Sequence, residues 1–284
     1  MILKSADRFY FLIVGCQRSG TTLMRLILDS HSSIQCHDES LAYNVFRGSA
    51  ELICQRPLIG FKVPQVTEQL AWPLLRHDNF YQQGGGRDLE VRNPYIGQKI
   101  IFMIRDARDV VASMVTLPHW FERYGNPVLE ARIAGDSKFK DRYSTEISFC
   151  EASRFPKIAR AALIWRYKMD ALFGYLRRGY PLLPLWYEAL VASPRTELLR
   201  VCAFLQIPWE EAILRHPSSP RFELGLDGRA MGRTDPGRSI DAMSVGRWRS
   251  QFTSEQLREI IVVAGPALFP LYPNAVLRQS SIRT

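Results

Sequence analysis

Short apolar runs recur along the chain and predict the strands of a buried sheet. They cover residues 9–14, 58–63, 100–104 and 182–186. The first run, FYFLIV, lacks the alternation of polar and apolar positions that marks a strand with one face in water. It is instead typical of a central parallel strand that is covered on both faces.

Stretches with helical periodicity separate these runs. Residues 157–178 carry apolar side chains at helical spacing, from Ile158 through Trp165 to Leu176. Further helices are predicted over residues 21–31, 107–116, 194–205 and 254–263. Strands that alternate with helices along a chain form parallel sheets. We therefore expect an α/β fold in which residues 1–284 form a single domain, with a central parallel sheet flanked by helices.

Three segments depart from this pattern. Residues 80–97 include three consecutive glycines and several polar residues, so we expect a surface excursion there. Residues 117–156 are mixed in charge and predict an irregular insert. Residues 217–241 are rich in Gly, Pro, Ser and Arg, which favours a mobile segment that could lie over a site as a lid.

Length and charge limit the class of partner. The 284 residues suffice for one sizeable core, and 37 Lys and Arg against 28 Asp and Glu give a formal net charge of +9. Such a surface attracts anions. The basic residues are scattered among acidic and apolar ones, which argues against nucleic acid as the main partner. A small anionic ligand fits better.

The cysteines and the apolar segments indicate the setting. The five cysteines are widely spaced and include no CxxC pair, so they predict neither a disulfide framework nor a zinc site. The N-terminal apolar run lacks a signal-peptide layout, and residues 260–272, with two prolines, fall short of the ~20 residues of a membrane helix. We expect a soluble, cytoplasmic protein without membrane insertion. The oligomeric state stays open, with a homodimer as one option.

The sharpest motif is GCQRSGTT, residues 15–22, between the first predicted strand and the first predicted helix. At such a junction, free backbone N–H groups and the helix dipole bind phosphate. Thr21 stands where the nucleoside-triphosphate loop requires lysine. The loop therefore favours a single 5′-phosphate, with Arg18 as the cation. A plain glycine turn between core elements is the alternative.

The motif and its surroundings resemble the sulfotransferases that use 3′-phosphoadenosine 5′-phosphosulfate (PAPS). CQRSGTTLMRLILDSH looks like their 5′-phosphosulfate loop, and IIFMIRDARDVVASM like their strand–loop–helix for the 3′-phosphate. The second match assigns Arg105 and Ser113 to the 3′-phosphate. A structural arginine paired with Asp106 or Asp109 is the alternative. The first match assigns to the 5′ end of the cofactor Arg18, Ser19, Gly20, Thr21 and Thr22.

Two later stretches extend the resemblance. LPLWYEALVASP is similar to the family's strand with a Tyr-Glu pair beside the adenine, so Tyr187 is the expected contact, although aromatic core packing is an equal alternative. MSVGRWRSQF is similar to the late loop that closes over the 3′-phosphate. Gly246 there is typical of a backbone that closely approaches an anion, whereas a solvated basic turn is the alternative. This match assigns to the cofactor Arg247, Trp248 and Arg249.

Within the superfamily, the tyrosylprotein sulfotransferases are the most similar, through SGTTLMR, LDSH, CHDES, FLQIPWEEAILRH and GRTD. Their glutamate aligns with Glu39, which is therefore the candidate base for the acceptor hydroxyl, with Asp38 and His37 as competitors. Lys62, at the end of the second predicted strand, is the candidate that stabilises charge on the sulfuryl oxygens; a surface lysine is the alternative. With Arg18, these two residues form the predicted catalytic set.

The resemblance implies a sulfotransferase of the EC 2.8.2 type, with a P-loop-like phosphate-binding loop in the sulfotransferase fold. It would transfer a sulfuryl group from PAPS to a hydroxyl and release 3′-phosphoadenosine 5′-phosphate (PAP), without a metal. The acceptor stays open among peptide tyrosine, phenol, sugar and small metabolite, as does sulfation that primes an elimination. Other classes are a P-loop nucleotide kinase or triphosphatase, which needs the missing lysine, and a non-catalytic relative that binds a nucleotide or peptide.

Overall fold

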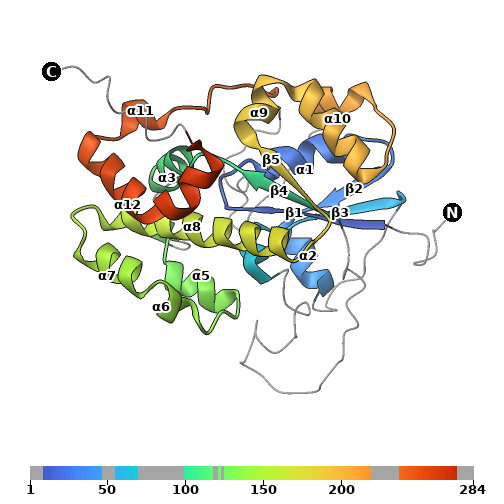
Figure 1. Cartoon of the computed structure of the whole chain (residues 1–284). Helices are drawn as coiled ribbons and strands as arrows, with labels where there is room; N and C mark the ends of the chain where they lie inside the picture. The colour runs from blue at the N-terminus through green and yellow to red at the C-terminus, as the bar shows by residue number, and fades with distance from the viewer. Residues whose placement is uncertain are drawn as a thin grey trace, which may run out of the picture.

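A parallel sheet of five strands lies at the centre of the molecule (Figure 1). The computed structural model describes residues 9–46, 55–69, 99–117, 121–122, 125–218 and 237–273. All neighbouring strands in this part of the chain are parallel, in the order β2-β3-β1-β4-β5. The strands are β1 (Phe9–Gly15), β2 (Ile34–His37), β3 (Leu58–Lys62), β4 (Lys99–Ile104) and β5 (Leu182–Trp186).

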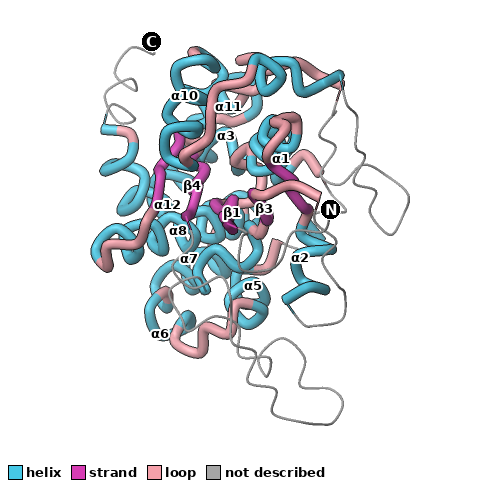
Figure 2. The backbone as a smooth tube through the Cα atoms, turned by 90° about the vertical axis from the view of Figure 1, so that its right-hand side faces the viewer, coloured by secondary structure: helices cyan, strands magenta, loops and turns pink. Residues whose placement is uncertain are grey.

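Helices cover both faces of the sheet, as expected from the unbroken apolar strands. Along β1, Phe11 and Ile13 belong to one hydrophobic cluster, whereas Leu12 and Val14 belong to the other. Figure 2 shows the strands between helices on either side. The first cluster includes residues of α1 (Thr21–Asp29), α10 (Pro194–Leu205) and the 3-10 helix η3 (Glu211–Ser218), and the second includes residues of α3 (Ala107–Val115), α8 (Pro156–Arg177) and α12 (Ser254–Leu271).

The register of the sheet brings the ends of the central strands to one edge. Ile13 of β1 pairs with Lys62, the last residue of β3. Gly15, the last residue of β1, pairs with Met103, one residue before the end of β4. In open parallel sheets, ligands bind at this carboxyl edge, next to the strand from which the order runs both ways. The predicted phosphate loop follows that strand.

One strand was not predicted from the hydrophobic pattern. β2 spans four residues between α1 and α2 (Glu39–Phe46), and the predicted second strand is therefore β3. Only two β2 side chains are buried, those of Ile34 and Cys36. Two apolar positions are too few to distinguish a strand from a turn by periodicity.

The prediction of an irregular insert over residues 117–156 was wrong. This stretch contains α5 (Pro127–Ile133), α6 (Phe139–Arg142) and α7 (Ser144–Ala152). Asn126 caps α5, because its side chain accepts N–H bonds from Val128 and Leu129. These helices are shorter than three turns, so none of them repeats its apolar positions often enough to show a period.

The C-terminal helix is longer than predicted. α12 continues through Pro266 and Pro270 to Leu271, whereas the pattern predicted an end near residue 263. Both prolines lie on the exposed side, so the carbonyl groups that lose their N–H partners are near solvent. The opposite side is buried in the core through Val263, Ala267 and neighbours, which outweighs the lost bonds.

Some predictions fall outside the described residues. These are the surface excursion at 80–97 and most of the lid segment, residues 219–236. Cys16, Cys36, Cys150 and Cys202 are described, and each is buried and takes no part in a disulfide within the described residues. In the part of the chain that the structure describes, no helix combines the length and the hydropathy that a membrane span requires.

Candidate active site

A buried threonine fixes the start of the loop that follows β1. Gly15 donates its N–H to Oγ1 of Thr67 at 3.0 Å, and the same hydroxyl lies 2.9 Å from the Gly15 carbonyl oxygen. Thr67 belongs to the 3-10 helix η2 (Pro64–Gln69), two residues after β3. Gly15 has a φ of 130° and packs against the Met103 backbone, so a side chain does not fit there. The loop therefore leaves the sheet at a point defined by β1, β3 and β4.

The loop then turns sharply before α1 begins. Ser19 donates its N–H to the Cys16 carbonyl oxygen at 3.1 Å, and Arg18 and Gly20 have φ values of 72° and 92°. Thr21 is the first residue of α1. The N–H groups of a first helical turn have no intrahelical acceptor and carry the positive end of the helix dipole. This is the geometry that binds an anion at a strand-to-helix junction.

Glu39 and Lys62, both predicted as catalytic, form an ion pair beside this loop. Lys62 Nζ lies 3.0 Å from Glu39 Oε1 and 3.4 Å from Oγ1 of Thr22. The Lys62 side chain is 3% exposed, which excludes a surface lysine, and that of Glu39 is 16% exposed. Glu39 begins α2 two residues after the end of β2, so the unpredicted strand brings it to the carboxyl edge of the sheet. The competitor Asp38 instead accepts an N–H bond from Leu41 within α2.

Two arginines connect the predicted 5′ and 3′ groups. Arg18 Nε donates to Oγ of Ser113, on α3, at 3.0 Å. Arg105 follows β4 and donates from Nη1 to the Arg18 carbonyl oxygen at 3.0 Å and from Nη2 to that of Ser244 at 2.5 Å. The structure therefore brings together the loop, α3 and the segment 243–252.

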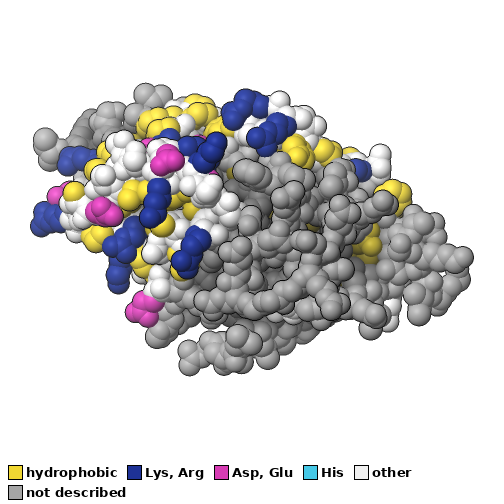
Figure 3. All heavy atoms as spheres, turned by 90° about the horizontal axis from the view of Figure 1, so that it is seen from below, with side chains coloured by type: hydrophobic (Ala, Val, Ile, Leu, Met, Phe, Trp, Pro, Cys, Tyr) yellow, Lys and Arg dark blue, Asp and Glu magenta, His cyan; other side chains and the backbone are white. Residues whose placement is uncertain are grey.

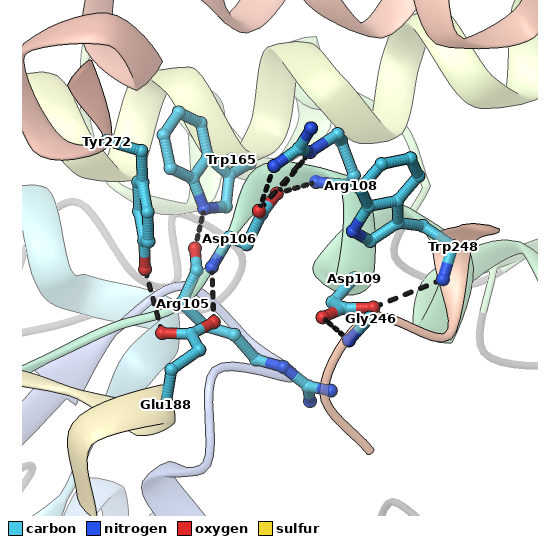
Figure 4. Close-up of polar contacts among 9 residues, drawn as sticks. All are labelled: Arg105, Asp106, Arg108, Asp109, Trp165, Glu188, Gly246, Trp248 and Tyr272. Carbon is cyan, nitrogen blue, oxygen red and sulfur yellow. Dashed lines mark hydrogen bonds and ion pairs between the residues drawn. The ribbon is translucent and has the colours of Figure 1, made fainter. Parts of the chain in front are cut away.

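The aspartates beside Arg105 have other partners. Asp106 caps α3 and binds the guanidinium of Arg108 at 2.5 Å, and Asp109 accepts backbone N–H bonds (Figure 4). Within the described ranges, Arg105 forms an ion pair with neither of them. Its Cζ lies 4.4 Å from the centre of the Tyr187 ring. The structure therefore contradicts the alternative of an ion pair between Arg105 and one of these aspartates.

Tyr187 lies against the loop. It is the first residue of α9 (Tyr187–Ala192), directly after β5, and belongs to neither hydrophobic cluster. A Cβ on Gly20 would lie 2.6 Å from Cδ2 of Tyr187, so the ring and the loop are in close contact. The tyrosine side chain therefore contacts both the phosphate loop and Arg105.

The segment 243–252 lies against α3 through Asp109. Oδ2 of Asp109 accepts the Gly246 N–H at 2.6 Å, and Oδ1 accepts the Trp248 N–H at 3.2 Å. The sequence predicted that Gly246 brings the backbone close to an anion, and the anion in the structure is the Asp109 carboxylate. Trp248 begins α11 (Trp248–Gln251), and Arg247 and Arg249 on either side of it are exposed.

Two donor atoms at the loop are buried without a hydrogen-bond partner among the described residues. They are Oγ of Ser19 and Nε of Arg105. Both are donors, and buried donors usually have an acceptor. Phosphate oxygens would satisfy both, so these residues fit a nucleotide phosphate. The described residues contain no group of three or more His, Cys, Asp or Glu side chains that could hold a metal.

Comparison with known proteins gives the site its family. The sulfotransferase domain family matches residues 96–268, which include Arg105, Ser113 and Tyr187, and a second sulfotransferase family matches residues 11–57, which include the loop and Glu39. The chain belongs to the sulfotransferase family. Its activity is therefore PAPS-dependent sulfuryl transfer, of the EC 2.8.2 type.

Individual relatives of this sulfotransferase are distant. A Caenorhabditis briggsae protein named "Putative protein-tyrosine sulfotransferase" is 25% identical over 285 residues, which cover 93% of this chain and 88% of the relative. The sulfotransferase domain of a Synechococcus olefin synthase superposes with a TM-score of 0.53 at 17% identity, covering 93% and 98% of the two chains. A mouse sulfotransferase complexed with PAP gives 0.50 at 14% identity, covering 92% and 84%. These structures share the sulfotransferase fold.

A buried carboxylate holds the backbone around Arg105 in this sulfotransferase. Glu188 Oε1 accepts the Asp106 N–H at 2.9 Å, and Oε2 accepts the Tyr272 hydroxyl at 2.9 Å (Figure 4). On the other side of the same peptide, Trp165 Nε1 donates to the Arg105 carbonyl oxygen at 2.9 Å. Burial raises the pKa of Glu188, against the opposing effect of these hydrogen bonds. The sequence matched the Tyr-Glu pair but did not indicate what the glutamate binds.

A second buried network supports the loop, and no pattern in the sequence indicated it. Gln17 Nε2 donates to Glu130 Oε2 at 3.0 Å, and Lys168 Nζ lies 3.6 Å from the same oxygen. Lys168 also donates to the Gln65 carbonyl oxygen of η2 at 2.9 Å. Burial raises the pKa of Glu130, although Lys168 lowers it. These residues lie on four separate elements, so only the fold brings them together.

The net positive charge of the sulfotransferase is not confined to this site. Figure 3 shows Lys and Arg side chains spread over the described part of one face, among hydrophobic and acidic ones. Several basic side chains are paired, such as Arg166 with Glu146 at 3.0 Å. This scatter agrees with the absence of a basic stripe in the sequence.

Proposed function

We propose that Glu39 is the general base that accepts the proton of the acceptor hydroxyl. The observation that carries this proposal is the Glu39–Lys62 ion pair, at 3.0 Å, with Lys62 also 3.4 Å from Thr22 of the phosphate loop. A base must lie within reach of the reacting group, and this contact supports the role of Glu39 because its carboxylate lies close to the first turn of α1. Sulfuryl transfer needs that proximity, because the acceptor oxygen forms its bond to sulfur as the bond to the leaving phosphate breaks.

The loop and two cations supply the charge that the transfer requires. PAPS contributes the sulfuryl group, and the protein contributes donors directed at the leaving phosphate and the sulfuryl oxygens. Lys62 is the residue proposed to stabilise the sulfuryl oxygens, because its ammonium group is buried beside the loop. Arg18 and the N–H groups of residues 19–22 are proposed to bind the 5′-phosphate. No metal has a role in this proposal.

The 3′-phosphate and the adenine are proposed to bind beside Arg105, Ser113 and Tyr187. Arg105, whose buried Nε has no hydrogen-bond partner among the described residues, and Ser113, in contact with Arg18, support this placement of the 3′-phosphate. Tyr187 lies beside both Arg105 and Gly20, which supports an adenine contact at that ring. The segment 243–252 completes the proposed set with Arg247, Trp248 and Arg249.

The acceptor is proposed to be a hydroxyl on a peptide tyrosine, a phenol, a sugar or a small metabolite. The similarity to relatives named as protein-tyrosine sulfotransferases supports a tyrosyl peptide as the first compound to test. We also propose that the whole chain, residues 1–284, forms one domain. The described helices on both faces pack against a single sheet, which supports this.

Nucleotide binding tests the class of enzyme. PAP should raise the melting temperature of the protein without magnesium, whereas ATP with magnesium should not. Stabilisation by ATP and magnesium alone would favour a P-loop kinase. Turnover is then measured with labelled PAPS and a panel of tyrosyl peptides, phenols and sugars, and binding of PAP without transfer to any acceptor would favour a non-catalytic relative.

Two adjacent carboxylates provide a matched test of the base. Glu39→Gln should leave PAP affinity within about twofold and lower turnover by about 10²-fold or more. Asp38→Asn should retain most of the turnover, because the side-chain contact described for Asp38 is the bond that it accepts from the Leu41 N–H at the start of α2. The reverse pattern would transfer the role of base from Glu39 to Asp38.

A further inference from the structure

The first part of the segment 243–252, up to Gly246, is held in place mainly by polar contacts. Met243 is 77% exposed and Val245 is 37% exposed, so the first part of the segment buries little apolar surface. Without such burial, the position of a segment depends on its hydrogen bonds and ion contacts. Three residues that follow β4 make such contacts with the segment. Arg105 donates to the Ser244 carbonyl oxygen, and Asp109 accepts two backbone N–H bonds. The guanidinium of Arg108 lies over the Trp248 ring.

Asp109 makes the strongest of these contacts. The residue is 2% exposed, and its carboxylate accepts two backbone N–H bonds, at 2.6 Å from Gly246 and 3.2 Å from Trp248. Hydrogen bonds to an ionised acceptor are stronger than neutral ones, and the first turn of a helix favours a negative charge. Asp109 lies in that first turn of α3, so the carboxylate is stabilised from both sides.

The backbone conformation of Gly246 allows it to donate this hydrogen bond. Its φ is 75°, in the left-handed region, and a Cβ there would collide with a guanidinium nitrogen of Arg249. This conformation directs the N–H groups of residues 246 and 248 to one point, which Asp109 occupies. The Trp248 ring is then held by Arg108, whose Cζ lies 4.1 Å from the ring centre.

The docked segment also completes the surroundings of Arg105. Arg105 Nη2 donates to the Ser244 carbonyl oxygen, and Nη1 donates to that of Arg18. Arg105 is therefore held between the phosphate loop and the segment, which leaves its Nε without a partner among the described residues. If the segment moved away from α3, the guanidinium would lose one of the two hydrogen bonds described for it.

We propose that Asp109 is a positioning residue for the end of the nucleotide that carries the 3′-phosphate. It holds the segment 243–252 on α3, and the segment in turn orients Arg105 and presents Arg247 and Arg249 on the same side. Asp109 does not itself touch the nucleotide, because both of its oxygens are occupied and its charge would repel a phosphate. This inference rests on the proposed function, in particular on a 3′-phosphate beside Arg105.

Comparison of PAP with adenosine 5′-monophosphate (AMP), which lacks the 3′-phosphate, tests the proposal by calorimetry. Asp109→Asn replaces one acceptor oxygen by an amino group that cannot accept an N–H bond, so PAP affinity should fall by about tenfold or more while AMP affinity changes by less than about twofold. A residue with a merely structural role would weaken both nucleotides alike, and that result, or no change in either, would overturn the proposal.

Two further variants make the test decisive. Gly246→Ala disturbs the same contact from the segment side and should produce the same loss of selectivity for PAP, so it replaces Asp109→Asn if that variant does not fold. Glu255→Gln is the matched control, because the side-chain contact described for Glu255 is with Arg154, outside the segment 243–252, and PAP affinity should stay within about twofold. Wild-type protein that binds no PAP would refute the proposed function itself, an outcome distinct from unchanged selectivity in the variants.

Discussion

Arg18 Nε donates a hydrogen bond to Oγ of Ser113 at 3.0 Å, which joins the phosphate loop to the helix that follows β4. The contact links a residue proposed for the 5′ end of the donor with a residue proposed for its 3′ end. Binding at the two ends should therefore not be independent in this sulfotransferase.

A double-mutant cycle on these two residues should reveal coupling. Ser113→Ala removes the acceptor, and Arg18→Lys keeps the charge but removes Nε. Each should weaken PAP binding, and the double variant should lose less than the sum by about 0.5–1.5 kcal/mol, since both act through one bond. Calorimetric titration of the four proteins gives the coupling energy. Strictly additive losses would mean that the contact has no part in nucleotide binding.

The sequence predicted which residues lie at this part of the site, but not the contacts between them. The strand–loop–helix order placed the ends of β1, β3 and β4 at one edge of a parallel sheet, which brings Arg18, Lys62 and Arg105 near each other. The hydrogen bond between Arg18 and Ser113 could not be predicted in this way. It depends on the rotation of α3 about its axis and on the positive φ of Arg18, and neither follows from residue type.

The missed elements have a common physical cause. β2 buries only Ile34 and Cys36, and α6 has four residues, so each is too short for a periodic signal. The predicted end of α12 was too early because prolines usually stop helices. Burial of its inner side instead keeps this helix intact through Pro266 and Pro270. Glu130 and Lys168 show the other limit, since no local pattern indicates that two distant charged residues will share a buried site.

Variants of the Glu39–Lys62 pair should distinguish the effect of Glu39 on stability from its effect on turnover. Glu39→Gln leaves the buried Lys62 ammonium without its carboxylate, so the free energy of unfolding should fall by about 1–3 kcal/mol together with turnover. Glu39→Gln combined with Lys62→Met removes both charges and should recover much of that stability but none of the turnover. Urea unfolding and a PAPS assay of the same samples measure both quantities. Recovery of turnover in the double variant would show that Glu39 is not the base.

The stability of the protein should depend on pH through Glu130. Because burial raises the pKa of Glu130 above its ordinary value of 4.5, the native state binds the proton more tightly than the unfolded state does. The contribution of Glu130 to the free energy of unfolding should therefore fall as the pH rises from about 4.5 through the raised native pKa. It should level off above that pKa.

Glu130→Gln isolates this contribution. As the pH rises, the unfolding free energy of the wild type should fall relative to that of the variant. Urea titrations between about pH 4.5 and 8 measure this difference. The change is the opposite of that expected for a carboxylate stabilised by its ion pair. A difference that grows in favour of the wild type with pH would mean that Lys168 dominates over burial.

Glu188 offers a last test, because its two oxygens serve two separate elements. Tyr272→Phe removes the hydroxyl bonded to Oε2 but leaves the Asp106 N–H on Oε1 and the Trp165 bond to the Arg105 carbonyl oxygen. This variant should lose about 1–2 kcal/mol of stability while its PAP affinity stays within about twofold. Glu188→Ala also frees the Asp106 N–H, so it should lose stability and in addition weaken PAP binding by about fivefold or more, with AMP less affected. Equal losses of PAP affinity in both variants would mean that Arg105 is positioned through the packing of α12, and not through the hydrogen bond that Glu188 accepts from the adjacent backbone.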